Sequence, residues 1–476
     1  MKQYRKLFAR CSIFVLLVHI TVSPASLAIT IQEEEELSKE FLRVARKQFI
    51  LIEDPFVVGY VNKIGRNILS TLPPQPFKYR FYVVKQHVYN AFATPAGHIF
   101  IHTGLLGALE NEEELAGIIA HEIAHVVSRH ISQKIDRSPK IGLATLAGVF
   151  AGVFIGVGGA AALGNAVVAG SMAAGQSASL AFSREDELQA DQLALAYLYQ
   201  AGYDAKGLLT SLQKMRSKQW FGTDQVPSYL MTHPASEERM AYIDTSLENK
   251  RLPEEKRRHI NEDDFRYVRA TVLGKHGDGQ NALAEFEARL KSHPEDTISI
   301  YGKALALAQL GDYSGAVSHL RQALEKNALN PVMLKELGRI YFLEGQYTKA
   351  LQTLEGSYGL APRDGESLFY LSRTHMALGN LDQAAEGFRA YLKQKPKDTE
   401  VHRFLGNIYG MQEELGQAHY HLGKYNQMKG RWETAVVHLE KALPLVTDAK
   451  QKEEIEALLK KVRKAAKREA REQDNG

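Results

Sequence analysis

Residues 116–127 place three ionisable side chains, His121, Glu122 and His125, in an otherwise apolar run. In a helix, His121 and His125 lie one turn apart on the same face, with Glu122 about 100° further round the axis. Two imidazoles at this spacing can bind one zinc ion, and the adjacent carboxylate is a candidate general base for hydrolysis. Because short H-E-x-x-H strings also occur by chance, the rest of the chain must support this interpretation.

Residues 183–191 contain a second set of possible ligands, in which Glu187 and Asp191 are also one helical turn apart. If a second helix crosses the first, Glu187 can be the third zinc ligand and Asp191 can accept a histidine ring N–H. The alternative is a solvated acidic helix start, which the spacing alone would favour. Together with the histidine motif, however, the zinc-ligand interpretation is preferred. It leaves the fourth coordination position of the zinc ion for water.

The remaining histidines of this half do not have ligand spacing. His130 follows His125 by five residues and does not share its helical face, so we expect a surface side chain. His87, His98 and His102 have no helical partner and are not expected to bind metal.

The surrounding elements indicate how these residues are positioned. Asn111 and the glutamates after it are typical of a helix start, and residues 33–69 also have a helical pattern. Residues 79–84 and 96–102 are strand-like, which predicts a small sheet before the motif helix. Residues 90–106 form either a structural hairpin or an exposed sheet edge that adds a substrate peptide as another strand. In the second case Asn90, Ala91 and Phe92 are the candidate substrate-binding residues.

The whole chain of 476 residues is 45% hydrophobic and 24% charged, which is ordinary for a globular protein. Basic residues, a short apolar run and a small-residue site at residues 26–28 predict a signal peptide, 1–28, cleaved after Ala28. Its four basic residues equal the net charge of +4, so the mature chain is formally neutral and nucleic acid is not an expected partner. The single cysteine, Cys11, lies in this segment, which excludes disulfides and thiol ligands from the mature protein.

Residues 141–182 carry no charge and many glycines. The segment is long enough to span a bilayer, but its glycines also suit a packed helical hairpin, a mobile lid or peripheral membrane contact. We rank peripheral contact or a packed hairpin above a true span.

The second half is a repeat array of tetratricopeptide period, in which an alanine recurs every 34 residues. The alanines are Ala282, Ala316, Ala350, Ala384 and Ala418. A glycine precedes each of the first four by five residues, and a bulky apolar residue follows each alanine by four. A new repeat begins half a period early near Gly430, so one helix is expected to serve two repeats. Stacked helix pairs of this kind form a surface for peptides or partner proteins.

The two motifs together resemble the metallopeptidase family that includes the CAAX prenyl endopeptidases and the periplasmic β-barrel assembly-enhancing proteases. The resemblance covers about residues 30–245 and includes residues 90–92, 103–106 and 232–239. It implies one zinc ion per chain on His121, His125 and Glu187, with Glu122 as the catalytic carboxylate. It also implies that His233 lies near the metal, either to stabilise the oxyanion or to plug the open position.

The predicted fold is mainly α. A zincin-like α+β metallopeptidase domain with a small sheet, 29–260, precedes an all-α tetratricopeptide solenoid with a basic C-terminal helix, 261–476. By resemblance, we expect a periplasmic zinc endopeptidase whose substrates are misassembled outer-membrane β-barrel proteins and whose repeats bind the β-barrel assembly machinery. The alternatives are a non-proteolytic chaperone or adaptor with a structural or latent zinc site, and an integral-membrane protease.

Overall fold

The computed structural model describes residues 29–137, 182–217 and 228–474. The predicted signal peptide, 1–28, lies outside these residues, as does all of the glycine-rich segment, 141–182, except Phe182. The chain divides into two units: Met1–Ile52 with Val58–Phe265, and Glu53–Val57 with Arg266–Gly476. None of the helices within the described ranges is long and apolar enough to cross a membrane.

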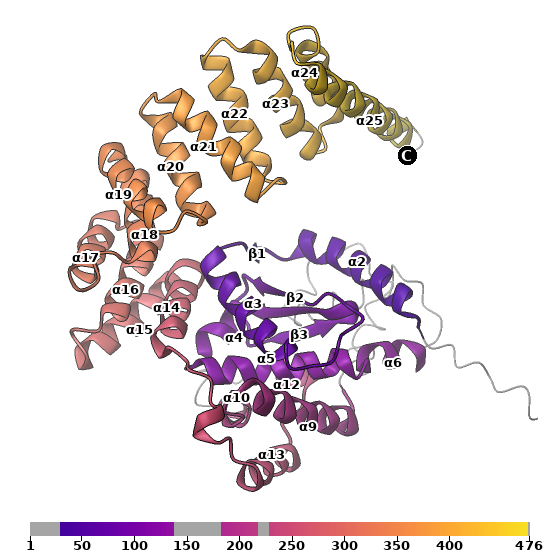
Figure 1. The fold of residues 1–476 in the computed structure, drawn as a ribbon, viewed down its shortest axis with the longest axis vertical. Coiled ribbons are helices and arrows are strands. Elements are labelled where there is room, and N and C mark those ends of the chain that lie inside the picture. Colours follow the sequence, from indigo (N-terminus) through magenta and orange to yellow (C-terminus); the bar gives the residue numbers. More distant parts are fainter. Residues whose placement is uncertain (1–28, 138–181, 218–227, 475–476) are drawn as a thin grey trace, which may run out of the picture. The chain divides into compact units, whose positions relative to one another are not determined.

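The first unit contains a four-stranded sheet with helices around it (Figure 1). Its strands are β1 (Leu51–Ile52), β2 (Arg80–Val84), β3 (Ala91–Thr94) and β4 (His98–His102), in the order β1-β2-β4-β3. Strands β2 and β4 are parallel, whereas β1 pairs with β2 and β3 pairs with β4 in antiparallel fashion. The helices are α2 (Ile31–Gln48), α3 (Pro55–Leu69), α4 (Thr103–Ala108), α5 (Glu112–Val127), α6 (His130–Arg137), α9 (Arg184–Ala201), α10 (Lys206–Arg216), α12 (Ser228–Thr232) and α13 (Glu237–Asn249), with short 3-10 turns at Pro95–Gly97 and Glu254–Lys256.

The helical stretch expected over residues 33–69 is interrupted. Helix α2 ends at Gln48, Phe49 is extended, and β1 pairs with the end of β2 before α3 begins at Pro55. Proline cannot continue a helix interior and disfavours helical backbone at the residue before it, so a new helix starts here. Asp54 accepts a hydrogen bond from the Phe56 N–H at 3.0 Å.

A row of aromatic side chains packs α2 onto the sheet. Tyr82, Phe92 and Phe100 lie opposite one another on β2, β3 and β4 and stack with ring centroids 4.8 and 5.0 Å apart. Phe41 of α2 meets the rings of Phe92 and Phe100 edge-on. Because Phe92 belongs to this core, its side chain is buried.

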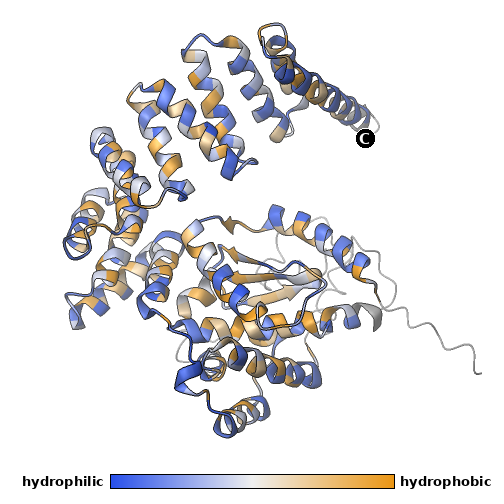
Figure 2. Ribbon diagram, in the orientation of Figure 1, coloured by the Kyte–Doolittle hydropathy of each residue, from blue (hydrophilic) through white to orange (hydrophobic). Residues whose placement is uncertain are grey.

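The second unit is a stack of helices whose apolar residues are buried between neighbouring helices (Figures 1 and 2). Its helices are α14 (Glu262–Thr271), α15 (Gly279–Ser292), α16 (Thr297–Gln309), α17 (Tyr313–Lys326), α18 (Pro331–Leu343), α19 (Tyr347–Leu360), α20 (Gly365–Ala377), α21 (Leu381–Gln394), α22 (Thr399–Met411), α23 (Leu415–Met428), α24 (Trp432–Ala442) and α25 (Ala449–Asp474), with a π-helical turn at Val272–His276. Mainly helical architecture with one small sheet is therefore the observed fold class.

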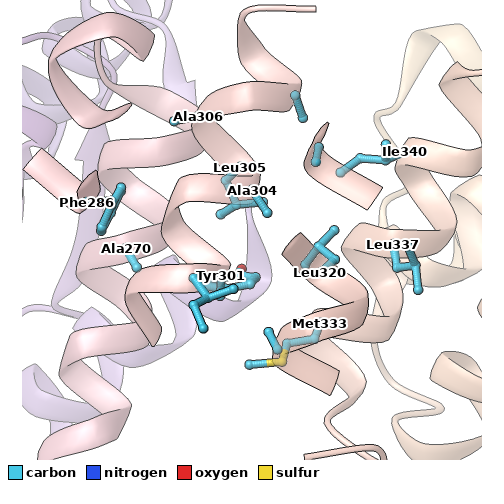
Figure 3. Close-up of a cluster of buried hydrophobic side chains, with 14 of the residues drawn as sticks. Ala270, Phe286, Tyr301, Ala304, Leu305, Ala306, Leu320, Met333, Leu337 and Ile340 are labelled. Atoms are coloured by element: carbon cyan, nitrogen blue, oxygen red, sulfur yellow. The ribbon is translucent and has the colours of Figure 1, made fainter. Parts of the chain in front are cut away.

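The repeat spacing seen in the sequence corresponds to buried contacts. The repeated alanines and the first four bulky residues after them lie in the core between the helices, as Figure 3 shows for Phe286 and Leu320, whereas Leu422 is half-buried. Small residues allow close approach: a Cβ on Gly338 would lie 2.5 Å from Leu354. Gly311, Gly345 and Gly379 have positive φ in the turns, whereas Glu413 adopts φ 61° where the next repeat lacks the glycine.

Helix α23 packs against both α22 and α24 and serves two repeats. A Cβ on Gly406 of α22 would meet Leu422 of α23, and one on Gly423 of α23 would meet Leu439 of α24, both 16 residues further on. The same helix–helix contact is therefore repeated half a period early, and α23 is the second helix of one pair and the first of the next.

Buried charges in the second unit surround Lys275. Its Nζ lies 2.7 Å from carboxylate oxygens of Glu336 and Glu366 and 3.2 Å from Asp54, which belongs to this unit. Burial disfavours the ammonium, but these carboxylates raise the pKa of Lys275 well above its usual value. The three carboxylates have the spacing of metal ligands, yet the cations Lys275, Lys335 and Arg339 already balance their charge.

Candidate metal centre

Helix α5 carries the histidine motif and begins as the sequence indicates. The Asn111 side chain accepts a hydrogen bond from the Glu114 N–H at 2.9 Å, and three glutamates occupy the first turn. Gly117 permits close packing, because a Cβ there would lie 2.7 Å from the backbone of Leu208 in α10. The helix is buried along most of its length, so His121, Glu122 and His125 are buried with it.

Helix α9 packs against α5 and brings the acidic residues to the histidines. Ser183 and Asp186 form a reciprocal capping box at its start, which fixes the first turn. Glu187 and Asp191 then lie one turn apart on the buried face. Helix α9 is therefore the predicted second helix, and it places Glu187 and Asp191 beside the histidines of α5.

Four donor atoms from α5, α9 and the residue after α12 converge on one point: His121 Nε2, His125 Nε2, a Glu187 oxygen and His233 Nδ1. The two Nε2 atoms are 3.0 Å apart, and each is 3.4 Å from a Glu187 oxygen. His233 Nδ1 is 2.9 Å from Glu187 and 3.4 Å from His121. Tetrahedral zinc with bonds of about 2.0–2.1 Å separates its ligand atoms by about 3.3 Å, so this donor set fits that metal.

The charges of the site also fit a divalent cation. Glu122, Glu187 and Asp191 are at most 1% exposed. Arg239, which contacts Glu187 and Asp191, is the permanent cation that the described residues bring to this site. Three carboxylates and one guanidinium leave two uncompensated negative charges, which would be costly in a buried site. A zinc ion would balance them.

The pKa shifts reflect burial and the opposite charges that face one another in the cluster. Burial alone would lower the pKa of His121, but hydrogen bonds and charges from Asp191 and Glu187 raise it to about 9. Burial holds the pKa of His125 well below its usual value. Although burial favours the neutral acid, Arg239 and His121 lower the pKa of Asp191. Both carboxylates on α9 are thus arranged to remain ionised beside a positive charge.

Glu122 projects from α5 beside the ligands and does not share their contacts. Both of its carboxylate oxygens are buried without a hydrogen-bond partner among the described residues. The atom that most nearly faces it is His233 Nε2, 3.7 Å from Oε1. A buried carboxylate with unused acceptor capacity can receive a proton from a water or donate one to a leaving group.

His233 follows α12, a short helix fixed to the first unit at both ends. The Tyr229 N–H donates to the Tyr89 carbonyl, and the Phe182 N–H donates to the Thr232 carbonyl, both at 3.0 Å. The Tyr229 ring stacks on His233 with centroids 4.6 Å apart. Burial and the charge of Glu122 raise the pKa of Tyr229 well above its usual value, so it stays a neutral hydroxyl. His233 is the fourth donor of the cluster, at the position where the sequence predicted water.

Arg239, in the first turn of α13, joins the site to the segment that carries His233. Its guanidinium donates to both oxygens of Asp191 at 2.8 Å, to the Pro234 carbonyl at 2.8 Å, and contacts Glu187. Asp191 Oδ1 is in turn 3.0 Å from His121 Nδ1. Sequence reasoning included Arg239 in the similar segment but assigned it no role, because its contacts arise from residues 48 positions away.

The expectation that His130 is a surface residue is wrong. His130 is 1% exposed, its Nδ1 is 2.9 Å from His125 Nδ1, and its Nε2 is 2.8 Å from Gln189. Five residues would separate His130 from the face of His125 in a continuous helix, but α5 ends at Val127 and Arg129 turns the chain with φ 54°. His130 therefore begins α6 and orients the ring of His125 from the side away from the ligand atoms.

The candidate substrate-binding residues lie on or beside the edge strand β3. Asn90, Ala91 and Phe92 are at most 2% exposed, and the Asn90 carbonyl accepts from His102. The Phe92 ring belongs to the aromatic core. Only backbone groups of this strand remain to pair with a peptide, and they are buried in this conformation. Of the other histidines set aside, His87, His98 and His102 take no part in the cluster.

Comparisons with known proteins identify related peptidases. Residues 59–247 match peptidase family M48. The chain is 26% identical over 323 residues to a beta-barrel assembly-enhancing protease from Yersinia pestis, an alignment that covers 67% of this chain and 63% of that protein. It is 27% identical over 312 residues to a putative beta-barrel assembly-enhancing protease from Vibrio cholerae, covering 64% and 63%. The alignments thus span less than two thirds of these relatives.

The second unit matches tetratricopeptide repeats over residues 267–331, 301–365 and 341–408. Among solved structures, it is similar to the tetratricopeptide protein YrrB, described as having an unusual peptide-binding site, with 21% identity and a TM-score of 0.32 over 42% of this chain and 97% of that one. Residues 59–247, which include His121, His125 and Glu187, thus match peptidase family M48, and residues 267–408 match tetratricopeptide repeats.

Proposed function

We propose that this protein is a zinc-dependent endopeptidase that acts on unfolded or misassembled outer-membrane β-barrel proteins. The observation that carries the proposal is the convergence of His121, His125 and Glu187 on one point beside the unpartnered Glu122 carboxylate. A structural zinc site needs no general base beside its ligands. An acceptor carboxylate buried beside the ligands instead supports hydrolysis.

In the proposed mechanism, His121, His125 and Glu187 hold one zinc ion, whose chemistry is to polarise the scissile carbonyl and acidify water. Glu122 takes a proton from the attacking water and passes it to the leaving amine nitrogen. Asp191 holds the His121 ring by its Nδ1–H, with Arg239 fixing both oxygens of Asp191. His130 acts in the same way on His125.

His233 regulates access in this proposal. Its Nδ1 lies among the ligand atoms, where it takes the place that a water or substrate carbonyl would need. Cleavage then requires α12 and His233 to move away. The alternative role, stabilising the oxyanion, requires His233 to leave the ligand cluster but remain near it. Edge strand β3, with Asn90, Ala91 and Phe92, is proposed to pair with substrate through its backbone once it is uncovered.

The substrate class rests on the relatives named beta-barrel assembly-enhancing protease. The repeats support a role in binding client chains or the β-barrel assembly machinery, because stacked helix pairs present a continuous surface. A periplasmic location is proposed from the signal-like segment 1–28, with peripheral membrane contact through residues 141–182.

The proposal is tested by giving the zinc-loaded protein a urea-unfolded outer-membrane barrel protein, the same barrel folded in micelles, and an unfolded soluble protein of similar length. Cleavage of the unfolded barrel in preference to the other two is expected. Equal cleavage of both unfolded proteins would contradict the substrate class. If the Glu122→Gln variant does not cleave but still restores barrel assembly in cells, the protein acts as an adaptor.

A further inference from the structure

Arg373 lies on α20 among the rings of three successive first helices of the repeats. Its guanidinium is 4.5 Å from the ring centroid of Phe342 on α18, 5.5 Å from that of Phe404 on α22, and 5.8 Å from those of Phe369 and Tyr370 on α20. All five side chains are half-buried. We call Phe342, Phe369, Arg373 and Phe404 the Arg373 patch.

Neighbouring cations on these helices already have carboxylate partners. Arg339 pairs with Glu336 at 2.6 Å, and Arg403 pairs with Glu400 at 2.8 Å. Arg373 differs from both, because no carboxylate of the described residues lies within ion-pair distance and no hydrogen bond engages its guanidinium. The rings favour the cation over their faces but do not satisfy its N–H donors.

This arrangement fits a carboxylate ligand. A guanidinium presents its donors as a planar fork that binds a carboxylate through two parallel hydrogen bonds, and stacking on rings leaves the edge of that fork available. Half-burial among aromatic rings strengthens such a pair relative to one in open water. The same rings provide apolar contact for side chains next to the carboxylate.

We propose that the Arg373 patch binds an internal segment of an unfolded polypeptide in which an aspartate or glutamate stands next to aromatic residues. An internal segment fits better than a chain end, because the patch crosses α18, α20 and α22 while the array continues with helices before and after them. The one unpaired positive charge of the patch, the Arg373 guanidinium, matches one carboxylate of the peptide. The inference extends the proposed client binding by the repeats, and its test measures binding without cleavage.

The experiment uses the full chain carrying Glu122→Gln and a short fluorescent peptide, acetylated and amidated, with Phe-Asp-Phe at its centre. The reference peptide has Phe-Asn-Phe. We expect the aspartate peptide to bind about tenfold more tightly, as charge-assisted pairing predicts. Arg373→Gln should abolish this preference, and Arg373→Lys should retain part of it. The control Arg463→Gln on α25, whose partner is Glu440, should keep the preference. Mass spectrometry of the recovered peptide separates weak binding from residual cleavage, so failure here is distinct from failure of the proposed catalysis.

Equal affinity for the two peptides, or a preference that survives Arg373→Gln, would overturn the assignment. Tighter binding of an uncapped Phe-Asn-Phe peptide that ends in a free carboxylate would replace an internal segment with a chain end. If Arg373→Gln lowers the helical content of the protein, Arg373→Lys decides the question, because it keeps the charge and removes the fork. A reduced preference for the aspartate peptide then supports the assignment, and an unchanged preference overturns it.

Discussion

Arg239 binds Asp191 through two parallel hydrogen bonds, Nε to Oδ2 and Nη2 to Oδ1, each 2.8 Å long. Asp191 in turn faces His121 Nδ1, so the guanidinium on α13 fixes a ligand on α5 through a carboxylate on α9. The same guanidinium holds the Pro234 carbonyl next to His233. The geometry of the candidate metal centre and the position of His233 thus share one anchor.

Asp191→Asn should weaken zinc binding by about 10–100-fold, because the amide presents no charge to His121 and pairs poorly with Arg239. Zinc affinity is measured by competition with a chromogenic chelator. Glu185→Gln, on the exposed side of the same helix, is the control and should leave the affinity unchanged. Unaltered zinc affinity in Asp191→Asn would exclude the proposed positioning role.

His233→Ala should raise the rate of peptide cleavage by roughly tenfold or more while zinc content stays near one per chain, because the three other ligands remain. Initial rates on a quenched fluorescent peptide, with zinc measured on the same samples, test this. A fall in kcat with unchanged zinc would assign His233 to oxyanion stabilisation and not to blocking.

The buried pair His402 and His421 should make the repeats less stable in acid. Their Nδ1 atoms are 2.9 Å apart, and burial, with neighbouring positive charge, lowers the pKa of His402 to about 4 and that of His421 to about 3. Between these values and the unfolded pKa of about 6.5, the unfolded chain binds more protons than the folded one, so stability is complete above pH 6.5 and falls below it. The loss by pH 5 should be about 2 kcal/mol per histidine.

Hydrogen exchange of α22 and α23 at pH 7 and pH 5, corrected for intrinsic rates, measures this loss. The double substitution of His402 and His421 by Gln should reduce the pH dependence, whereas His319→Gln on α17, whose ring bonds a backbone carbonyl, should not. Equal pH dependence in all three proteins would refute the prediction.

Lys275→Met should destabilise the second unit by about 3 kcal/mol, because it leaves Asp54 buried without a paired cation, whereas Glu336 keeps Arg339 and Glu366 keeps Lys335. Lys303→Met is the matched control: its partner Glu287 is half exposed, and a loss below about 1 kcal/mol is expected. Urea unfolding followed by the helical signal compares them. Adding Asp54→Asn to Lys275→Met should restore part of the loss, because it removes the carboxylate that lost its cation. Unchanged stability in Lys275→Met would contradict this prediction.

The repeats and the convergence of the candidate ligand residues could be predicted because each has a local period. The 34-residue recurrence follows from helix pairs that stack in one way, and His121 with His125, like Glu187 with Asp191, follows from one helical turn. Even the early repeat near Gly430 was visible, because Gly423 and Ala435 restart the pattern that α23 and α24 then form.

Other features depend on where the chain turns and were not predictable from spacing. His130 reaches His125 only because Arg129 adopts a left-handed conformation after the end of α5. Arg239 and Phe182 reach the site through contacts between distant segments, and Phe182 stacks 3.9 Å from the His125 ring centroid. Likewise, the Phe92 side chain packs into the core because of how β3 pairs with β4, whereas the sequence predicted a substrate contact for Phe92.

The central claim is that the His121, His125 and Glu187 cluster binds zinc and that Glu122 performs proton transfer beside it. The most direct measurement is zinc content and cleavage of one unfolded substrate in the same preparations of the parent protein and Glu122→Gln. The account predicts about one zinc per chain in both, with cleavage lost by at least about 100-fold in the variant. Cleavage by zinc-loaded Glu122→Gln at a rate near that of the parent protein would contradict it.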